Sequence, residues 1–195
     1  MLINWKQREL NLKIVYYGPA FSGKTTNLIH THSKVSPQKR SELVSLKTQE
    51  DRTLYFDFLQ IELGKINGLT PKIHLYTVPG QALYESSRRL VLRGANGVVF
   101  VADSAEDRLY ATKDSWVNMQ DHLASFGILP ARFPTIVQFN KRDLPNALPS
   151  QQLAEELRVN GFPTFDASAV QGDGVLETLK AIIQDVMKSI QRELA

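Results

Sequence analysis

Eight residues near the start of the chain restrict its fold more than any other feature. Residues 18–25, GPAFSGKT, fit the phosphate-loop pattern G-x-x-x-x-G-K-[ST]. Such a loop surrounds a phosphate chain with backbone N–H groups. In this pattern Lys24 reaches the terminal phosphates and Thr25 offers its hydroxyl to a magnesium ion. The apolar run 12–17 precedes the loop and a helix predicted from residue 24 to about 34 follows it, which is the order the pattern requires.

The order of the other patterns predicts an α/β fold for residues 1–195 as a single domain. Runs typical of buried strands alternate with runs typical of helices, which indicates a doubly wound, mostly parallel sheet with helices on both faces, as in P-loop NTPases. An Asn-Gly turn signal at 67–68 lies between two strand-like runs and predicts one antiparallel edge hairpin. We expect strands at 10–17, 54–61, 72–78, 97–103, 133–140 and 164–165, and helices at 82–92, 106–126, 149–158 and 174–193. Asp103 or Ser104 is the expected N-cap of the second of these helices.

The composition and charge of the chain exclude several classes of function. The chain has 195 residues with 43% apolar and 22% charged side chains, which is ordinary for a soluble globular domain. A net charge of +3, with basic residues spread out apart from Arg88 and Arg89, argues against a nucleic-acid binder. No cysteine is present, so disulfides and thiolate metal sites are excluded. No signal peptide, long apolar run or lipidation motif is present, so we expect a cytoplasmic protein without its own membrane anchor, which a partner could recruit to the membrane or cell pole.

A second motif selects the nucleotide. Residues 140–143, NKRD, follow a predicted buried strand and match the N-K-x-D element of guanine-nucleotide proteins. A carboxylate at Asp143 accepts from both N1–H and the exocyclic amine of guanine, whereas adenine would leave that charge unpaired. The resulting discrimination is roughly a thousandfold or better. Lys141 is expected along the base and sugar, and Asn140 is expected to join this loop to the phosphate loop. A polar loop before Pro145 is the alternative interpretation.

A third element lies near residue 168. The small residues 167–169 follow the short strand and are expected to bring a backbone N–H to the guanine O6. Together the separated motifs resemble small Ras-superfamily GTPases over nearly the whole chain. More narrowly, the chain resembles the MglA group of bacterial polarity and gliding-motility GTPases, on residues 17–28, 52–58, 75–81 and 92–94.

The resemblance implies roles for further residues. Thr53 matches the switch I threonine that closes over magnesium and the γ-phosphate, Gln81 matches the glutamine that orients the attacking water, and Arg52 matches an intrinsic catalytic arginine. In other GTPases such an arginine contributes about 10³ to 10⁵ in rate; a solvated loop arginine is the alternative. Lys24 completes the catalytic set, and Thr25 and Thr53 are the expected metal ligands. The expected nucleotide-binding residues are Gly18, Ala20, Phe21, Ser22, Gly23, Lys24, Thr25, Thr26, Thr53, Gly80, Asn140, Lys141, Asp143, Ser168, Ala169 and Val170.

Two positions depart from the small-GTPase pattern. Most small GTPases have D-x-x-G after the third strand, with the acid near magnesium; Thr77 stands in that place, as is typical of the MglA group. Asp57 is a candidate replacement, and an exposed strand carboxylate is the alternative. Ala20 stands where the family usually has glycine. Its methyl group is expected to face the γ-phosphate and slow hydrolysis, unless the loop relaxes around it.

Two functions therefore remain. One is a molecular switch with bound GTP or GDP and Mg²⁺, whose partners the resemblance identifies as a roadblock-fold regulator of the MglB type and effectors of polarity or motility. The other is a nucleotide-loaded scaffold with little hydrolysis of its own. An ATP-dependent kinase is disfavoured by residues 140–143. Trp116 and Met119 are predicted core residues, a histidine metal site is not expected, and residues 1–8 with Trp5 form a docking arm or a covering strand.

Overall fold

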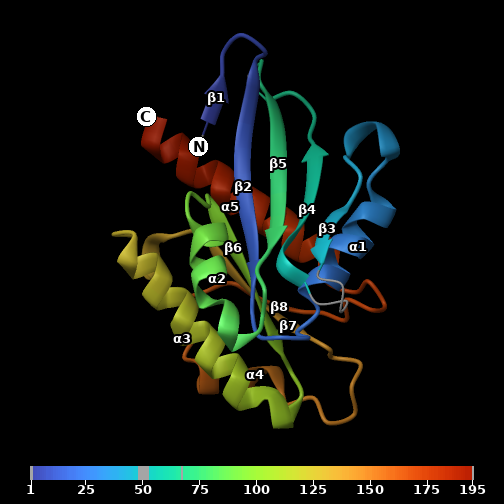
Figure 1. Cartoon of the computed structure of the whole chain (residues 1–195), viewed down its shortest axis with the longest axis vertical. Coiled ribbons are helices and arrows are strands. Elements are labelled where there is room, and N and C mark those ends of the chain that lie inside the picture. The colour runs from blue at the N-terminus through green and yellow to red at the C-terminus, as the bar shows by residue number, and fades with distance from the viewer. Residues whose placement is uncertain (1, 48–52, 67, 195) are drawn as a thin grey trace.

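The computed structural model describes residues 2–47, 53–66 and 68–194. In this part of the chain eight strands form one sheet in the order β3-β4-β5-β2-β6-β7-β8, with β1 on β2 (Figure 1). The strands are β1 (Leu2–Asn4), β2 (Glu9–Tyr17), β3 (Val44–Lys47), β4 (Thr53–Glu62), β5 (Thr70–Thr77), β6 (Gly97–Asp103), β7 (Thr135–Asn140) and β8 (Thr164–Asp166). The helices are α1 (Lys24–Lys34), α2 (Glu85–Leu92), α3 (Leu109–Ser125), α4 (Ser150–Leu157) and α5 (Val175–Leu194).

The centre of the sheet is parallel. β2 pairs in parallel with β5 and β6, and β6, β7 and β8 continue in the same sense. Every residue of β6 and β7 is buried, because helices cover both faces of these two strands. The predicted mostly parallel sheet is confirmed.

Antiparallel strands extend one side of the sheet. β4 and β5 are antiparallel, which confirms the predicted hairpin, and β3 adds to the outer edge of β4. At the start of the chain β1 pairs antiparallel with residues 9–11 of β2. β6 pairs only with residues 14–17 of β2, so β1 occupies the position that β6 leaves open.

Two hydrophobic clusters hold the helices to the sheet. α1 and α5 pack on one face through Leu28, Leu179, Ile182 and Val186, together with the side chains of β2 that point to that face. α2, α3 and α4 pack on the other face, where Trp116 and Met119 are 4% and 1% exposed. The two residues are therefore core residues, as predicted.

The expected element boundaries needed four corrections. The predicted helix 106–126 begins with a 3₁₀ turn (Glu106–Arg108), and α3 proper starts at Leu109. The predicted N-cap at Asp103 or Ser104 is wrong, since Ala105 precedes the 3₁₀ turn and Asp103 Oδ1 accepts instead from the Ala105 N–H at 3.2 Å. The predicted helix 82–92 likewise starts with a 3₁₀ turn (Ala82–Tyr84), and the strand predicted from 133 starts at Thr135 because Pro134 precedes it.

The parallel strands place the motifs on one edge. The chain leaves β2, β6, β7 and β8 at the same end of the sheet, so the loops after Tyr17, Asp103, Asn140 and Asp166 lie together. The helices of the described ranges include none that is long and apolar enough to cross a membrane.

Candidate functional site

The phosphate loop connects β2 to α1 and depends on glycine where other segments approach it. Gly23 has φ of 98°, and a Cβ on it would lie 2.1 Å from Asn140 Nδ2. A side chain at Gly23 would therefore be strained and would collide with the second motif. Gly23 O accepts from the Asn27 backbone N–H at 3.0 Å, which begins the helix directly behind the loop.

Lys24 lies under this loop with its ammonium group on backbone carbonyls. It is only 7% exposed, and Nζ donates to Gly18 O at 2.9 Å and to Pro19 O at 2.6 Å. Burial lowers the pKa of Lys24 to about 7, although the nearby Asp57 carboxylate opposes the shift. An ammonium group held this way is short of negative charge around it, so it suits a polyanion such as a phosphate chain.

Thr25 and Thr77 meet at a buried carboxylate. Asp57 is fully buried, and its Oδ2 accepts from Thr25 Oγ1 at 2.6 Å and from Thr77 Oγ1 at 2.8 Å. The Thr77 hydroxyl also accepts from the Asp57 backbone N–H at 2.8 Å, and Ser45 Oγ donates to Oδ1 at 2.5 Å. The alternative of an exposed strand carboxylate is therefore wrong: Thr77, in the place of the usual acid, holds an acid supplied by the neighbouring strand.

These three side chains suit a magnesium ion. The Thr25 hydroxyl donates its proton to Asp57, so its lone pairs are left for a hard cation, and the carboxylate supplies negative charge beside it. Residues 2–47, 53–66 and 68–194 contain no group of three or more His, Asp or Glu side chains placed to hold a metal. A cation here would take its remaining ligands from phosphate and water, as Mg²⁺ commonly does.

Two residues expected at the site fall partly or wholly outside the described structure. Arg52 lies outside the described residues. Thr53 is the first residue of β4, where its backbone pairs with Lys47.

Ala20 and Gln81 line the same hollow. A cavity of about 380 Å³ is bounded by the phosphate loop, the start of α1 and residues 77–81. Gly80 lies so close to the loop that a Cβ on it would be 2.4 Å from Ala20 N. The glycine is required by this approach, and it brings Gln81 next to Ala20. Phe21 and Thr26 also line this cavity, and the Phe21 side chain is 82% exposed with φ of 65°.

The second motif connects to the phosphate loop through Asn140. Its Nδ2 donates to Ser22 O at 2.7 Å, and its Oδ1 accepts from the Ala169 N–H at 2.8 Å. One buried side chain thus holds the loops after β2, β7 and β8 in a fixed arrangement. Asp143 lies beyond it, where Oδ1 accepts from Ser168 Oγ at 2.6 Å, and Val170 is 80% exposed at the rim.

Some residues of this site were missed from the sequence. Asp103 is fully buried at the end of β6, where Oδ2 accepts from Lys141 Nζ at 2.6 Å and lies 3.9 Å from Arg108 Nε. Arg108 Nη2 in turn donates to Ala20 O at 3.0 Å. A charged residue at the end of an apolar strand is the signal that could have indicated the role of Asp103. The N-cap prediction explained the same residue by helix capping. Asn27 and Gln138 exchange two hydrogen bonds of 2.9 and 3.0 Å behind the loop, and no local pattern indicates that pair.

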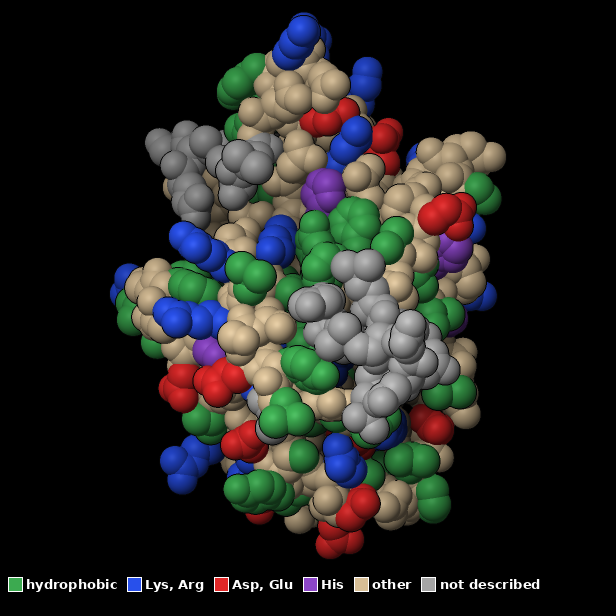
Figure 2. Space-filling view, in the orientation of Figure 1, with side chains coloured by type: hydrophobic (Ala, Val, Ile, Leu, Met, Phe, Trp, Pro, Cys, Tyr) green, Lys and Arg blue, Asp and Glu red, His purple; other side chains and the backbone are tan. Residues whose placement is uncertain are grey.

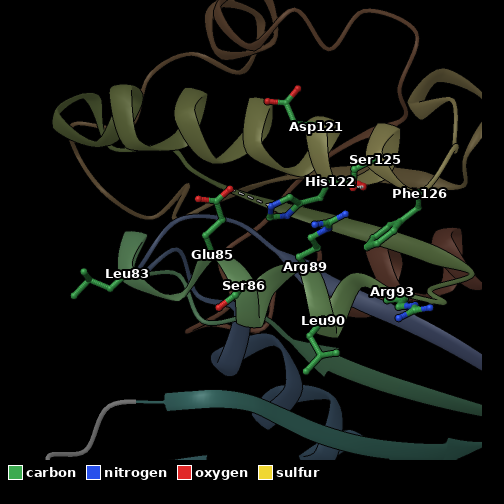
Figure 3. Close-up of a pocket in the computed structure, with 10 residues that line it drawn as sticks. All are labelled: Leu83, Glu85, Ser86, Arg89, Leu90, Arg93, Asp121, His122, Ser125 and Phe126. Atoms are coloured by element: carbon green, nitrogen blue, oxygen red, sulfur yellow. Dashed lines mark hydrogen bonds and ion pairs between the residues drawn. The ribbon is translucent and has the colours of Figure 1, made fainter.

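A polar network joins the segment after β5 to α3. Arg88 is 7% exposed, and it donates to Gln81 O at 2.5 Å and to Asn118 Oδ1 at 3.0 Å. Tyr17, directly before the phosphate loop, donates to the same Asn118 oxygen at 2.6 Å. Above this network α2 and α3 enclose a groove of about 1140 Å³, in which Glu85 points toward His122 at 3.5 Å (Figure 3). Through Arg88, Gln81 is thus connected to both α2 and α3.

The fold and the site together define a nucleotide-binding protein with a phosphate loop. At one edge of its sheet lie this loop, a buried acid beside Thr25 and an N-K-x-D loop. Residues 1–186 match the ADP-ribosylation factor family. The chain therefore belongs to this family of Ras-superfamily GTPases. It is also 45% identical over 190 residues to the mutual gliding-motility protein MglA of Myxococcus xanthus, and the match covers 97% of each chain.

Proposed function

We propose that this protein is a single-domain switch that binds GTP or GDP with Mg²⁺, hydrolyses GTP slowly, and acts in cell motility or polarity. The family supports a GTP-binding protein, and the relative's name supports the process. The single observation that carries the proposal is Asn140. Its contact with Ser22 O at 2.7 Å joins a phosphate-binding loop to a guanine-type base loop in one site.

Each side chain then has a stated task. Lys24 holds the terminal phosphates, and their negative charge favours its ammonium form. Asp143 accepts from guanine, and Ser168 keeps that carboxylate in place at 2.6 Å. Bound magnesium would supply charge neutralisation at the phosphates, with Thr25 as a ligand and Asp57 as the nearby acid.

Hydrolysis depends on residues around Ala20. Gln81 is proposed to orient the attacking water, with Thr53 as a further metal ligand and Arg52 as the intrinsic arginine. Gly80 lies against the Ala20 backbone, and Ala20 and Gln81 line the same cavity, so we place the extra methyl group beside the space that Gln81 has to occupy. This crowding supports slow turnover with intact binding. A nucleotide-loaded scaffold remains the second candidate, favoured by the same contact.

The partners are proposed from the resemblance to the MglA group. A roadblock-fold regulator of the MglB type would act on hydrolysis or exchange, and effectors would recognise the GTP-bound form. Recruitment to a cell pole would then depend on such partners.

Four proteins test the proposal: the chain itself and Ala20→Gly, each with and without Arg52→Ala. GTP binding and single-turnover hydrolysis are measured at saturating Mg²⁺. We expect slow hydrolysis that rises with glycine and falls by about 10³ or more without Arg52. If all four bind GTP and none hydrolyses it, the scaffold replaces the switch; if none binds GTP, both proposals fail.

A further inference from the structure

Two turns project side by side from the end of the sheet opposite the phosphate loop (Figure 1). One joins β1 to β2 and contains residues 5–8; the other joins β4 to β5. Their adjacency follows from the sheet, because Glu9 is in register with Thr70 and Thr70 N donates to Arg8 O at 2.8 Å. Neither turn takes part in the site described above.

The first turn holds a tryptophan in solvent. Asn4 fixes the turn, since its Oδ1 accepts from the Gln7 N–H at 3.2 Å and its Nδ2 donates to Gln7 Oε1 at 2.8 Å. Arg8 completes it with φ of 54°. Trp5 is consequently 74% exposed, and Ile66 in the second turn is 38% exposed. A large amphipathic indole held away from its own protein is suited to a membrane–water interface.

The charges at this end have one sign. Lys6, Arg8 and Lys65 are exposed, and residues 5–8 and 64–69 contain no acid. Glu9, just behind the turn, is paired with Lys72 at 2.6 Å. Glu62, the other nearby acid, ends β4 opposite Lys72 in the register. Figure 2 shows Lys and Arg side chains at the tip of the molecule and acidic side chains only below them.

We propose that this end of the sheet docks on an anionic lipid bilayer, with Trp5 and Ile66 at the headgroup level and Lys6, Arg8 and Lys65 against the phosphates. Because both turns project from the molecule, they can contact a flat surface together. Their basic side chains are complementary to the negative charge of the bilayer. Each basic residue near such a surface strengthens binding about fivefold, so three give about a hundredfold. The nucleotide site, at the opposite end, would face away from the membrane. This differs from the expectation that only a partner brings the chain there.

The chain has two tryptophans, and only Trp5 is exposed, which makes the contact measurable. In Trp116→Phe, Trp5 is the sole indole, and its emission is recorded with vesicles of phosphatidylcholine alone or mixed with phosphatidylglycerol. We expect a blue shift and quenching by brominated lipid with the anionic vesicles only. If Trp116→Phe does not fold, the difference spectrum between the unaltered chain and Trp5→Phe gives the same information.

A matched pair of double variants tests the charges by vesicle sedimentation. Lys6→Ser with Arg8→Asn is expected to weaken binding about thirtyfold. The control is Lys180→Ser with Arg158→Asn, which removes the same two residue types on α5 and after α4. Arg158 is also exposed with φ of 54°, so asparagine is equally tolerated at both arginines. Unchanged Trp5 emission, equal losses in both double variants, or an equal Trp5 shift with polyglutamate would each overturn the bilayer assignment.

Discussion

The substitution Asp57→Asn tests the idea that an acid from β4 serves the magnesium ion. The variant keeps the size of the side chain and removes its charge. Thr25 Oγ1 lies 2.6 Å from Asp57 Oδ2, and a Mg²⁺–O bond is about 2.1 Å. A magnesium ion on Thr25 would therefore lie within about 4.7 Å of the carboxylate oxygen.

That separation sets the expected effect. A divalent cation and a unit negative charge at about 4.7 Å attract each other by about 2 kcal/mol even in a medium with the dielectric constant of water, and by more in a partly buried site. Loss of the charge should raise the Mg²⁺ concentration needed for half-maximal retention of nucleotide at least about twentyfold. Release of a fluorescent GDP analogue, followed as Mg²⁺ is titrated, measures this concentration.

The control for this experiment is Ser45→Ala. It removes the hydroxyl that donates to Asp57 Oδ1 at 2.5 Å but leaves the carboxylate charge, so we expect less than about a threefold change. Thermal unfolding in EDTA shows whether each variant is folded. A folded Asp57→Asn protein with the magnesium dependence of the unaltered chain would refute the role of this acid.

Four further outcomes follow from the site and the core. Burial lowers the pKa of Lys24 from 10.5 to about 7, so above about pH 7 its amine is mostly neutral in the protein without nucleotide. Bound phosphates favour the ammonium form. GDP binding at about pH 8.5 should therefore take up a proton, seen as a binding enthalpy that depends on the ionisation enthalpy of the buffer; an enthalpy independent of buffer would contradict this. The same shift makes the nucleotide-free protein less stable as pH falls from about 10 to 7, because the unfolded chain then binds more protons than the folded one. Asp143→Ala should reduce the preference for GTP over ATP by roughly a thousandfold in competition binding, and a retained preference would remove Asp143 from base recognition. Trp116→Ala, at a core position 4% exposed between Phe100 and Phe162, should lower the free energy of unfolding by about 3–5 kcal/mol in urea titrations; a loss below about 1 kcal/mol would show that the site collapses without a cavity.

Much of the fold could be predicted because its signals are local. The strand at Gly97–Asp103 and the helix at Lys24–Lys34 have the predicted ends, since each is bounded by its own residue pattern. The hairpin of β4 and β5 followed from an Asn-Gly signal that lies between two apolar runs. The predicted starts of α2 and α3 were wrong because each helix is preceded by a 3₁₀ turn. Sequence periodicity does not separate such a first turn from the helix that follows it.

The order of strand-like and helix-like runs was enough to predict the fold class. The phosphate loop and the N-K-x-D loop could be recognised because each is a contiguous run whose residue types meet one chemical requirement. How distant residues combine depends instead on the packing of the folded chain. Asp57 meets Thr25 and Thr77, which are 32 and 20 residues away, through the pairing of β4 with β5 and the position of α1 beside them. Asp103 became the partner of Lys141 because β6 and β7 end side by side. A buried charge has to find a partner in space, and the chain register that brings the partner to it is set by the packing of the whole sheet.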